Sequence, residues 1–140
     1  METIKIKMRD IKNPGVSSAI RNLNNQPVNG KFAYKLHKLS TNLTKAIKHF
    51  DAKYTEYQDK YAEKNEDGTM KIVEDENGVK HFNIPDEKAK EAQEYLNAML
   101  DDEYDMEVTK LDAANLANVG IKASELFVLE NFFTNFEALE

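Results

Sequence analysis

Apolar residues recur every three or four positions between residues 32 and 61, and this stripe is the strongest pattern in the chain. The spacing is that of one face of an α-helix and lies close to a heptad seam. Because no Pro or Gly interrupts residues 31–67, the pattern predicts one helix over about residues 28–64. The stripe contains Phe, Leu and Ile up to Phe50 and only tyrosine beyond it: Phe32, Leu36, Leu39, Leu43, Ile47, Phe50, Tyr54, Tyr57 and Tyr61.

After this helix the apolar residues alternate, and residues 69–84 (TMKIVEDENGVKHFNI) are typical of a β-hairpin. A three-residue loop that ends in a left-handed Gly78 would pair Asp75 with Val79. The same register places two apolar pairs and one charge pair opposite each other, namely Ile72 with Phe82, Met70 with Ile84, and Glu74 with Lys80.

A second amphipathic helix is predicted over residues 86–103 (DEKAKEAQEYLNAMLDDE), where the acidic start suits a helix N-terminus. It is long enough to return antiparallel along the tyrosine part of the long helix. Small alanines on its inner side would allow a close approach to the tyrosines. The expected inner stripe is Ala89, Ala92, Leu96, Met99 and Leu100.

Two other segments alternate as strands do, residues 3–8 (TIKIKM) and residues 104–111 (YDMEVTKL). The two could pair, because Lys5 and Lys7 of the first would then oppose the acidic residues of the second. We therefore expect a small sheet that joins the N-terminus to a late part of the chain.

Three shorter elements complete the pattern. A short helix should begin near Pro14, and Asp112 should cap a turn that runs through Leu116. Residues 124–136 are predicted to form a final helix that is apolar on more than one face. In the short helix near Pro14, the residues expected to face inward are Val16, Ala19, Ile20 and Leu23.

These elements predict a mostly helical α+β fold. One long heptad-patterned helix would pack against an antiparallel partner helix, with a distal β-hairpin and a small sheet of the N-terminal and late strands. We expect a single domain over residues 1–140. Residues 28–101 would form a projecting helical hairpin arm tipped by the β-hairpin of residues 69–84, on a base of residues 1–27 and 102–140.

Charge is distributed unevenly along the chain. The net charge of −6 combines +8 for residues 1–53, with eleven Lys and Arg against three Asp and Glu, and −14 for residues 54–140, with eight against twenty-two. One interpretation is that the two halves pack on each other, so that their opposite charges cancel. The other is head-to-tail association between copies, or a basic face that meets an acidic partner.

Composition excludes several chemistries. The chain contains no Cys, which excludes disulfides, thiolate zinc sites and a Cys nucleophile. No apolar run approaches the roughly 20 residues that span a bilayer, and the charge-alternating N-terminus is not that of a signal peptide. We find no Gly-rich phosphate loop and no grouping of His37, His49 and His81. The sequence therefore predicts a protein that is not an enzyme, without cofactor or catalytic residues.

Residues 63–74 (EKNEDGTMKIVE) resemble a calcium-binding EF-hand loop, with Glu63, Asn65, Asp67, Gly68 and Glu74 at the ligand and glycine positions. An EF-hand needs a helix on both sides, whereas the residues after Gly68 alternate and reach an Asn-Gly turn. The favoured interpretation is a helix that exits into a hairpin, and no metal site is predicted.

Lysines line the polar face of the long helix and could neutralise phosphates. The chain has little Arg and no base-reading motif, and its second half is acidic. A solvated lysine face is therefore favoured over a nucleic-acid site. The lysines are Lys31, Lys35, Lys38, Lys45, Lys48 and Lys53.

Three groups of residues are candidates for contacts with other proteins. Tyrosines at the distal end of the stripe combine an apolar face with a polar hydroxyl, acids at the end of the second helix oppose its dipole, and phenylalanines gather near the C-terminus. They are Tyr54, Tyr57 and Tyr61; Asp101, Asp102 and Glu103; and Phe127, Phe132, Phe133 and Phe136.

Three segments carry a resemblance to a known group of proteins. They are LNNQPVNGKFAYKLHKLSTNL (residues 23–43), YAEKNEDGTMKI (residues 61–72) and KLDAANLANVGIKASELFVLENF (residues 110–132). In their apolar spacing and turn residues they resemble small acidic proteins of tailed bacteriophages, most of which have no assigned function. The resemblance implies a phage origin and brings no catalytic residues with it.

Two functions agree with these features. The first is a non-enzymatic virion-associated or assembly protein that docks on or bridges larger phage proteins, located in the virion or in the host cytoplasm during assembly. Its partners would be other phage proteins or copies of itself. The second is a soluble phage-encoded inhibitor or modulator that binds a host protein, possibly with its acidic half as a mimic of nucleic acid.

Overall fold

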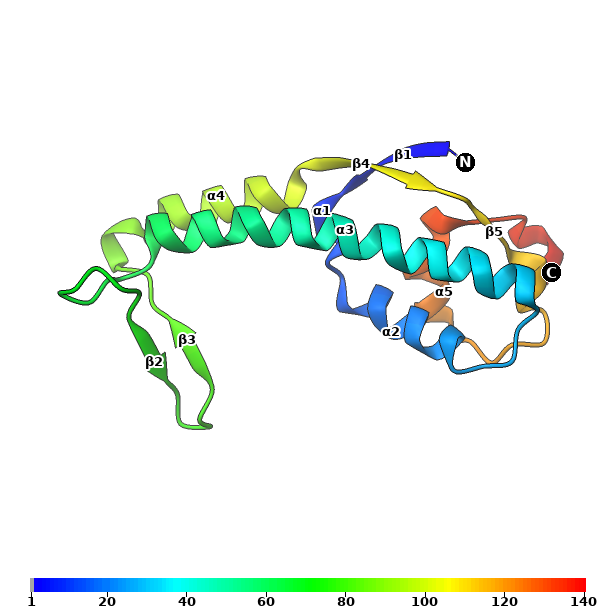
Figure 1. Ribbon diagram of the computed structural model, residues 1–140, viewed down its shortest axis with the longest axis horizontal. Helices are drawn as coiled ribbons and strands as arrows, with labels where there is room; N and C mark the ends of the chain where they lie inside the picture. Colours follow the sequence, from blue (N-terminus) through cyan, green and yellow to red (C-terminus); the bar gives the residue numbers. More distant parts are fainter. Residues whose placement is uncertain (1) are drawn as a thin grey trace. The chain divides into compact units, whose positions relative to one another are not determined.

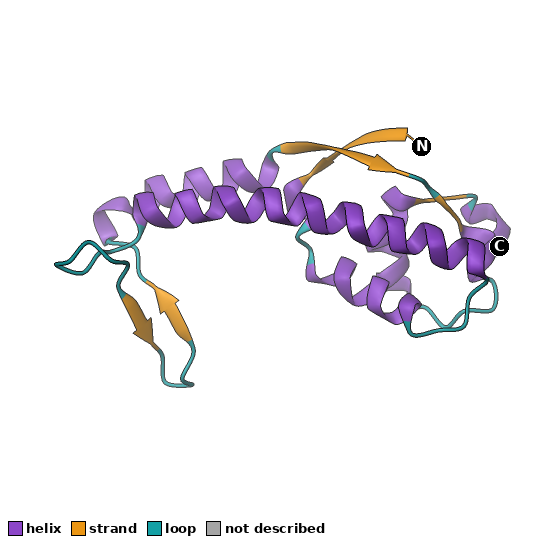
Figure 2. Cartoon of the chain, in the orientation of Figure 1, coloured by secondary structure: helices purple, strands orange, loops and turns teal. Residues whose placement is uncertain are grey.

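Helices make up most of the computed structural model, which describes residues 2–140 (Figure 1). Within this range the strands form three two-stranded sheets, β1–β4, β2–β3 and β5–β6 (Figure 2). The fold is the mostly helical α+β class that the sequence predicts. No helix among the described residues combines the length and the apolar character needed to cross a membrane.

The chain divides into two compact units. The terminal unit comprises Met1–Ile47 and Glu103–Glu140, and the central unit comprises Lys48–Asp102. The long helix α3, Gly30–Tyr61, contributes residues to both. The sequence assigned the whole helix to an arm that begins at residue 28. The structure instead gives its first half to the terminal unit, because elements from both ends of the chain cover that half.

The sheet of the terminal unit joins β1 (Glu2–Lys7) to β4 (Glu103–Val108) in antiparallel register. Ile6, Met106 and Val108 are buried on one face. On the other face Lys5 lies opposite Asp105, with 3.5 Å between Nζ and Oδ1, and Lys7 lies opposite Glu103. The predicted pairing of these strands through their charges is confirmed.

Two helices follow β1, the one-turn α1 (Met8–Ile11) and α2 (Pro14–Asn24). Pro14 occupies the first turn of α2, and the Asn13 side chain accepts a hydrogen bond of 2.9 Å from the amide of Gly15, so the helix begins with a cap that suits its residues. The four residues predicted to face inward are the buried ones: Val16, Ala19, Ile20 and Leu23.

The C-terminal segment departs from the prediction of one helix over residues 124–136, which is wrong. The helix α5 covers only Ala123–Leu129 and continues as the 3₁₀ helix η3, Glu130–Phe132. The chain then forms the short strand β6, Phe133–Thr134, parallel to β5, Leu111–Asp112. Phe133 is buried here, with its ring centroid 6.1 Å from that of Phe32. Pairing and packing with distant residues thus end the helix.

The remaining 3₁₀ helices flank this short parallel pair. The first, η2 (Ala113–Leu116), starts at Asp112, whose carboxylate accepts a hydrogen bond of 2.9 Å from the Ala114 amide. This is the cap that the sequence predicts. The second, η4 (Phe136–Leu139), follows Asn135, which has a left-handed backbone with φ of 64°. The Asn135 amide donates to Asp112 over 3.0 Å and so connects the two elements.

The core of the central unit lies between the end of α3 and α4 (Ala89–Asp101), which the 3₁₀ helix η1 (Asp86–Lys88) precedes. Tyr57 and Tyr95 stack with ring centroids 6.1 Å apart, and Tyr61 donates to Glu91 over 3.2 Å. Ala92 is fully buried, as predicted. Ala89 is exposed, contrary to the predicted inner stripe, because it lies at the first residue of α4.

The β-hairpin consists of β2 (Ile72–Glu74) and β3 (Lys80–Phe82), in the predicted register. Gly78 has a φ of 78°, and the Asp75 amide donates to the Val79 carbonyl over 3.0 Å. The pairing does not extend to Met70, which forms a bridge with Lys64 and not with Ile84. The hairpin is therefore shorter than residues 69–84.

The two units differ in net charge, and the fold brings basic and acidic ends of the chain into the same unit. The terminal unit contains eleven Lys and Arg against ten Asp and Glu, a net charge of +1, whereas the central unit contains eight against fifteen, a net charge of −7. In the terminal unit Lys5 pairs with Asp105, and Lys110 pairs with Glu2 at 3.9 Å. The basic start of the chain is therefore balanced by its own C-terminal segment.

Candidate docking surface

An exposed aromatic patch lies on the terminal unit, where α5 meets η4. Phe127 is its centre and is 71% exposed, the largest value among the large apolar side chains of residues 2–140. The surrounding side chains form a shallow hollow of about 260 Å³. We call this surface the Phe127 patch, and its residues are Ala123, Leu126, Phe127, Glu130 and Phe136.

Buried residues support the two aromatic rings of the patch, Phe127 and Phe136. Leu129 and Phe132 are fully buried beneath the surface, so α5 presents Phe127 on its outer side. The left-handed Asn135 turns the chain after β6, and Phe136 then lies with its ring centroid 6.3 Å from that of buried Phe133. The patch is therefore continuous with the buried core of the terminal unit.

Hydrogen bonds fix the start of α5 against α2. The Glu125 carboxylate accepts from the Lys122 amide at 2.9 Å and from the Asn22 side chain at 3.3 Å. Gln26 contacts both backbone groups of Gly120, donating to the carbonyl over 2.6 Å and accepting from the amide over 3.1 Å. These contacts give the patch a rigid support, which lowers the entropic cost of binding.

Acidic side chains predominate in the segment that carries the patch. No Lys or Arg follows Lys122 in the sequence, and Glu130, Glu137 and Glu140 are exposed. Aromatic side chains are the usual anchors of protein interfaces, with polar groups around them. The Phe127 patch therefore has the chemistry of a docking surface for a partner that is apolar and basic.

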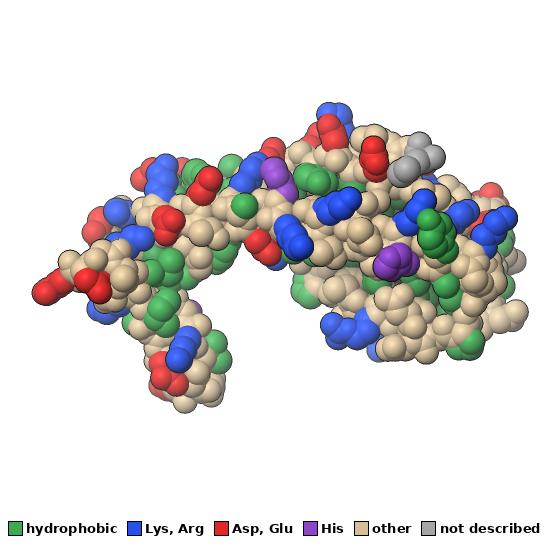
Figure 3. All heavy atoms as spheres, in the orientation of Figure 1, with side chains coloured by type: hydrophobic (Ala, Val, Ile, Leu, Met, Phe, Trp, Pro, Cys, Tyr) green, Lys and Arg blue, Asp and Glu red, His purple; other side chains and the backbone are tan. Residues whose placement is uncertain are grey.

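A second exposed aromatic residue lies among lysines on α3. Tyr34 is 61% exposed, and the Lys38 ammonium lies 5.0 Å from the centroid of its ring. Basic side chains follow one another along this part of α3 (Figure 3). We call the surface the Tyr34 face. It comprises Lys31 and Lys35 together with the lining of a hollow of about 380 Å³, namely Tyr34, His37, Lys38, Thr41, Asn42 and Glu107.

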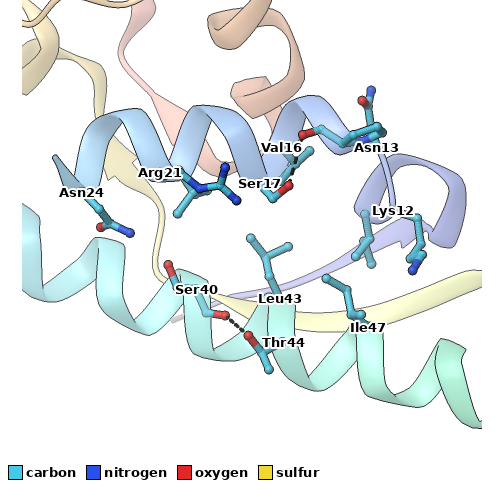
Figure 4. A pocket seen from close by; sticks show the side chains of 13 residues that line it. Lys12, Asn13, Val16, Ser17, Arg21, Asn24, Ser40, Leu43, Thr44 and Ile47 are labelled. Atoms are coloured by element: carbon cyan, nitrogen blue, oxygen red, sulfur yellow. Dashed lines mark hydrogen bonds between the residues drawn. The ribbon is translucent and has the colours of Figure 1, made fainter.

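The groove between α2 and α3 is larger, at about 520 Å³ (Figure 4). Leu43 reaches from α3 toward α2 at its floor, and Lys12 and Arg21 contribute cationic side chains to its lining. Its lining is more apolar than polar, although Val16 and Leu43 are themselves buried. None of the described residues that line the groove is aromatic, so it lacks the kind of anchor that Phe127 provides.

The phenylalanines that the sequence proposed for docking separate into two groups. Phe127 is exposed and Phe136 is half-buried, and the structure brings both into one patch. Phe132 and Phe133 are core residues and do not reach the surface.

The tyrosines of the stripe belong to the core of the central unit. Tyr57 and Tyr61 are buried there, and Tyr54 is half-buried with its ring centroid 5.4 Å from that of Tyr57. Burial raises the pKa of the Tyr57 hydroxyl, and the neighbouring Tyr54 and Tyr61 add to this effect. These rings hold α3, α4 and the hairpin together.

The acidic residues at the end of α4 fall in different units, with Asp101 and Asp102 in the central unit and Glu103 in the terminal unit. Asp102 pairs with Lys53 over 3.1 Å in the central unit, while Glu103 belongs to β4 and lies opposite Lys7. Asp101 is exposed at the last position of α4. The exposed ion pair with Lys53 accounts for Asp102 without a partner protein.

The loop that resembles an EF-hand has the backbone of a turn. Gly68 is left-handed with φ of 86°, and the chain continues into β2 without a second helix. Glu63 lies 3.6 Å from the Lys71 ammonium. The Thr69 hydroxyl and amide donate to Asp67 and hold the pKa of that carboxyl below its ordinary 3.8. Within residues 2–140 no three His, Asp or Glu side chains are grouped as metal ligands.

Tyr34 is the residue of these surfaces that the sequence did not single out. It lies one turn before Lys38 and off the apolar stripe, so it has no place in the predicted core. An aromatic ring among lysines on the polar face of a helix is the signal that could have identified it.

Comparison of the chain with family models, with curated proteins and with solved structures gave no match.

Proposed function

We propose that this chain is a non-enzymatic assembly protein of a tailed bacteriophage, which docks on a larger phage protein through the Phe127 patch. It would act in the virion, or in the host cytoplasm during assembly. The observation that carries the proposal is the exposure of Phe127 over a rigid, buried support. The phage origin rests on the sequence resemblance.

The chemistry of the patch defines the partner surface. Phe127 and Phe136 would enter an apolar pocket, because aromatic anchors contribute most when they are fully desolvated. Glu130 would lie at the rim and favour a pocket that is bordered by Lys or Arg, which increases the rate and the selectivity of association.

The test is particle association in cells that produce the phage encoding the chain. Tagged full-length wild type should be recovered in the purified particle or assembly fraction, and Phe127→Asp should be depleted there by tenfold or more, since each 1.4 kcal/mol of lost affinity is a factor of about ten. Val79→Asp is the matched control, because Val79 is also exposed but lies on the hairpin. Equal recovery of wild type and Phe127→Asp would refute the proposal.

A second candidate is a soluble inhibitor that binds a host protein through the central unit. The net charge of −7 on Lys48–Asp102 favours it, since a surface of one sign can imitate nucleic acid. The full chain should then slow the cleavage of a labelled DNA duplex by host extract, and added salt should weaken this effect. Replacement of Glu74, Asp75 and Glu76 by their amides should reduce the inhibition. Unchanged cleavage would exclude this mode of action.

A further inference from the structure

Four large apolar side chains are strongly exposed among residues 2–140, and two of them are aromatic. Both aromatic residues, Phe127 and Tyr34, lie in the terminal unit. Their exposed fractions of 71% and 61% mean that the two rings do not cover each other within one chain. Each is therefore open to a second molecule.

The two rings have surroundings of opposite charge. Lys31, Lys35 and Lys38 lie within about one helical turn of Tyr34 along α3, and Lys38 lines the same hollow. The segment that carries Phe127 contains only acidic charges after Lys122. The Tyr34 face also contains one acid, Glu107, whose backbone carbonyl accepts from the Asn42 side chain over 2.8 Å. His37 completes the hollow beside the tyrosine.

We propose that the Phe127 patch of one copy packs against the Tyr34 face of another copy. The inference rests on the proposed docking role of the patch and adds a second copy of this chain as a further partner, since the copy at the end of a head-to-tail oligomer keeps its Phe127 patch free for the larger phage protein. Phe127 would pack against the Tyr34 ring, which lines the hollow of about 380 Å³ on the Tyr34 face. Glu130 and its acidic neighbours would then meet Lys31 and Lys38 at the rim.

This contact joins two different surfaces and is therefore heterologous. A heterologous contact leaves one free patch at each end of a pair, so copies add head to tail until a ring closes or a filament grows. Exposed ion pairs contribute little each and are screened by salt, which makes the aromatic contact the main source of affinity. The association should accordingly weaken, and not vanish, at high ionic strength.

The experiment measures molar mass by light scattering after size exclusion, with the full chain at low and at high salt. Wild type should have a mass that rises with protein concentration to a multiple of one chain, and salt should lower it. Phe127→Asp and the pair Lys31→Glu with Lys38→Glu should each be monomeric. Lys35 is left unchanged, because its charge acts on Asp112.

Mixing the two defective proteins gives the decisive result. Phe127→Asp retains an intact Tyr34 face and the Lys31/Lys38 variant retains an intact Phe127 patch, so an equimolar mixture should form a one-to-one dimer and nothing larger. A mixture that stays monomeric would overturn the proposal. Val79→Asp should behave as wild type, and all variants should keep the wild-type circular dichroism spectrum, because the altered side chains are at the surface.

The other outcomes are also informative. A wild-type chain that is monomeric up to millimolar concentration would overturn this inference, while loss of Phe127→Asp from phage particles would still support the docking function. Nucleic acid that copurifies with wild type and is lost in the Lys31/Lys38 variant, without any change of mass after nuclease treatment, would overturn it in favour of a polyanion site.

Discussion

At the scale of single residues, burial decides the role of each aromatic side chain near the C-terminus. Phe127 and Phe132 are five positions apart in similar sequence surroundings, yet one is 71% exposed and the other fully buried. The difference arises because Phe132 lies where the helix ends and the chain turns into the core, whereas Phe127 is on the outer side of α5.

These two residues form a matched pair for a stability measurement. Phe132→Ala should lower the free energy of unfolding by about 3–5 kcal/mol, because it removes a fully buried ring and leaves a cavity. Phe127→Ala should change it by less than about 0.5 kcal/mol, as surface substitutions usually do. Urea denaturation of the full chain, followed by circular dichroism, checks both. Similar losses for the two would contradict the burial described here.

Asp112 provides a prediction on pH. The Ala114 amide, then the Asn135 amide and the charge of Lys35 hold the pKa of its carboxyl below the ordinary 3.8. Since the folded value is lowered, Asp112 stabilises the fold above its unfolded pKa, and this contribution is lost as pH falls through the folded value. Titration by carboxyl-carbon NMR should show the low pKa.

A substitution separates the causes of this shift. Asn135→Gly suits the left-handed backbone and removes the amide donor, so it should raise the pKa of Asp112 part of the way toward 3.8. Asp112→Asn should remove the associated loss of melting temperature between pH 4 and pH 2. A pKa of Asp112 at or above 3.8 in the wild type would contradict the hydrogen bonding described for this site.

At the scale of elements, the hairpin shows how one residue sets a register. Gly78 closes the three-residue loop with a φ of 78°, a conformation that side chains with a Cβ rarely adopt. The pairs Ile72–Phe82 and Glu74–Lys80 follow from this loop. The hairpin has only two strands, so its stability depends on the contact of Phe82 with Tyr54 and Tyr57.

Gly78→Ala should therefore destabilise the hairpin by about 1–2 kcal/mol, the cost of a left-handed conformation for a residue with a Cβ. Amide hydrogen exchange measured by NMR should become faster at Asp75, whose amide donates to the Val79 carbonyl, and at Val73 and His81, the next hydrogen-bonded pair of the ladder. Gly30→Ala is the control, because a Cβ there meets no atom within 4 Å and no positive φ is required. It should leave the exchange of these amides unchanged. Unaltered exchange in Gly78→Ala would mean that the loop does not hold the register.

At the scale of the whole molecule, two units with separate cores share one chain. The terminal unit is nearly neutral and the central unit carries −7, so the net negative charge of the molecule lies in the central unit. The core of the central unit consists of tyrosines, whose contacts join α3, α4 and β3. A substitution in this tyrosine core should therefore lower the stability of the central unit more than that of the terminal unit.

Tyr57→Ala tests this division. Tyr57 is buried against Tyr54, Tyr61, Phe82 and Tyr95, and its removal should cost about 3 kcal/mol or more within the central unit. Hydrogen exchange followed by mass spectrometry should show the larger loss of protection in peptides from residues 48–102. Tyr34→Ala, at an exposed position, serves as the control and should leave protection unchanged. An equal loss across both units would argue against separate cores.

Local patterns in the sequence were sufficient to predict most of the helices and strands. The three- and four-residue spacing identified α3, Asn13-Pro14 identified the start of α2, Asp112 identified η2, and the Asn-Gly loop identified the hairpin with its register. These features depend on neighbours within a few positions, where helix period, capping and turn geometry act. The pairing of β1 with β4 was accessible as well, because Lys5 and Lys7 of one strand lie opposite Asp105 and Glu103 of the other.

Only the tertiary structure determined how the C-terminal segment folds and which of its phenylalanines are exposed. Residues 124–136 have helical spacing, but pairing of Phe133 with Leu111 and its packing against Phe32 outweigh local preference there. The same distant contacts bury Phe132 and leave Phe127 outside, and they place the acidic C-terminal segment in the same unit as the basic N-terminus. Sequence pattern states which residues are apolar or charged, whereas burial depends on segments that are a hundred residues apart in the chain and meet only in the folded molecule.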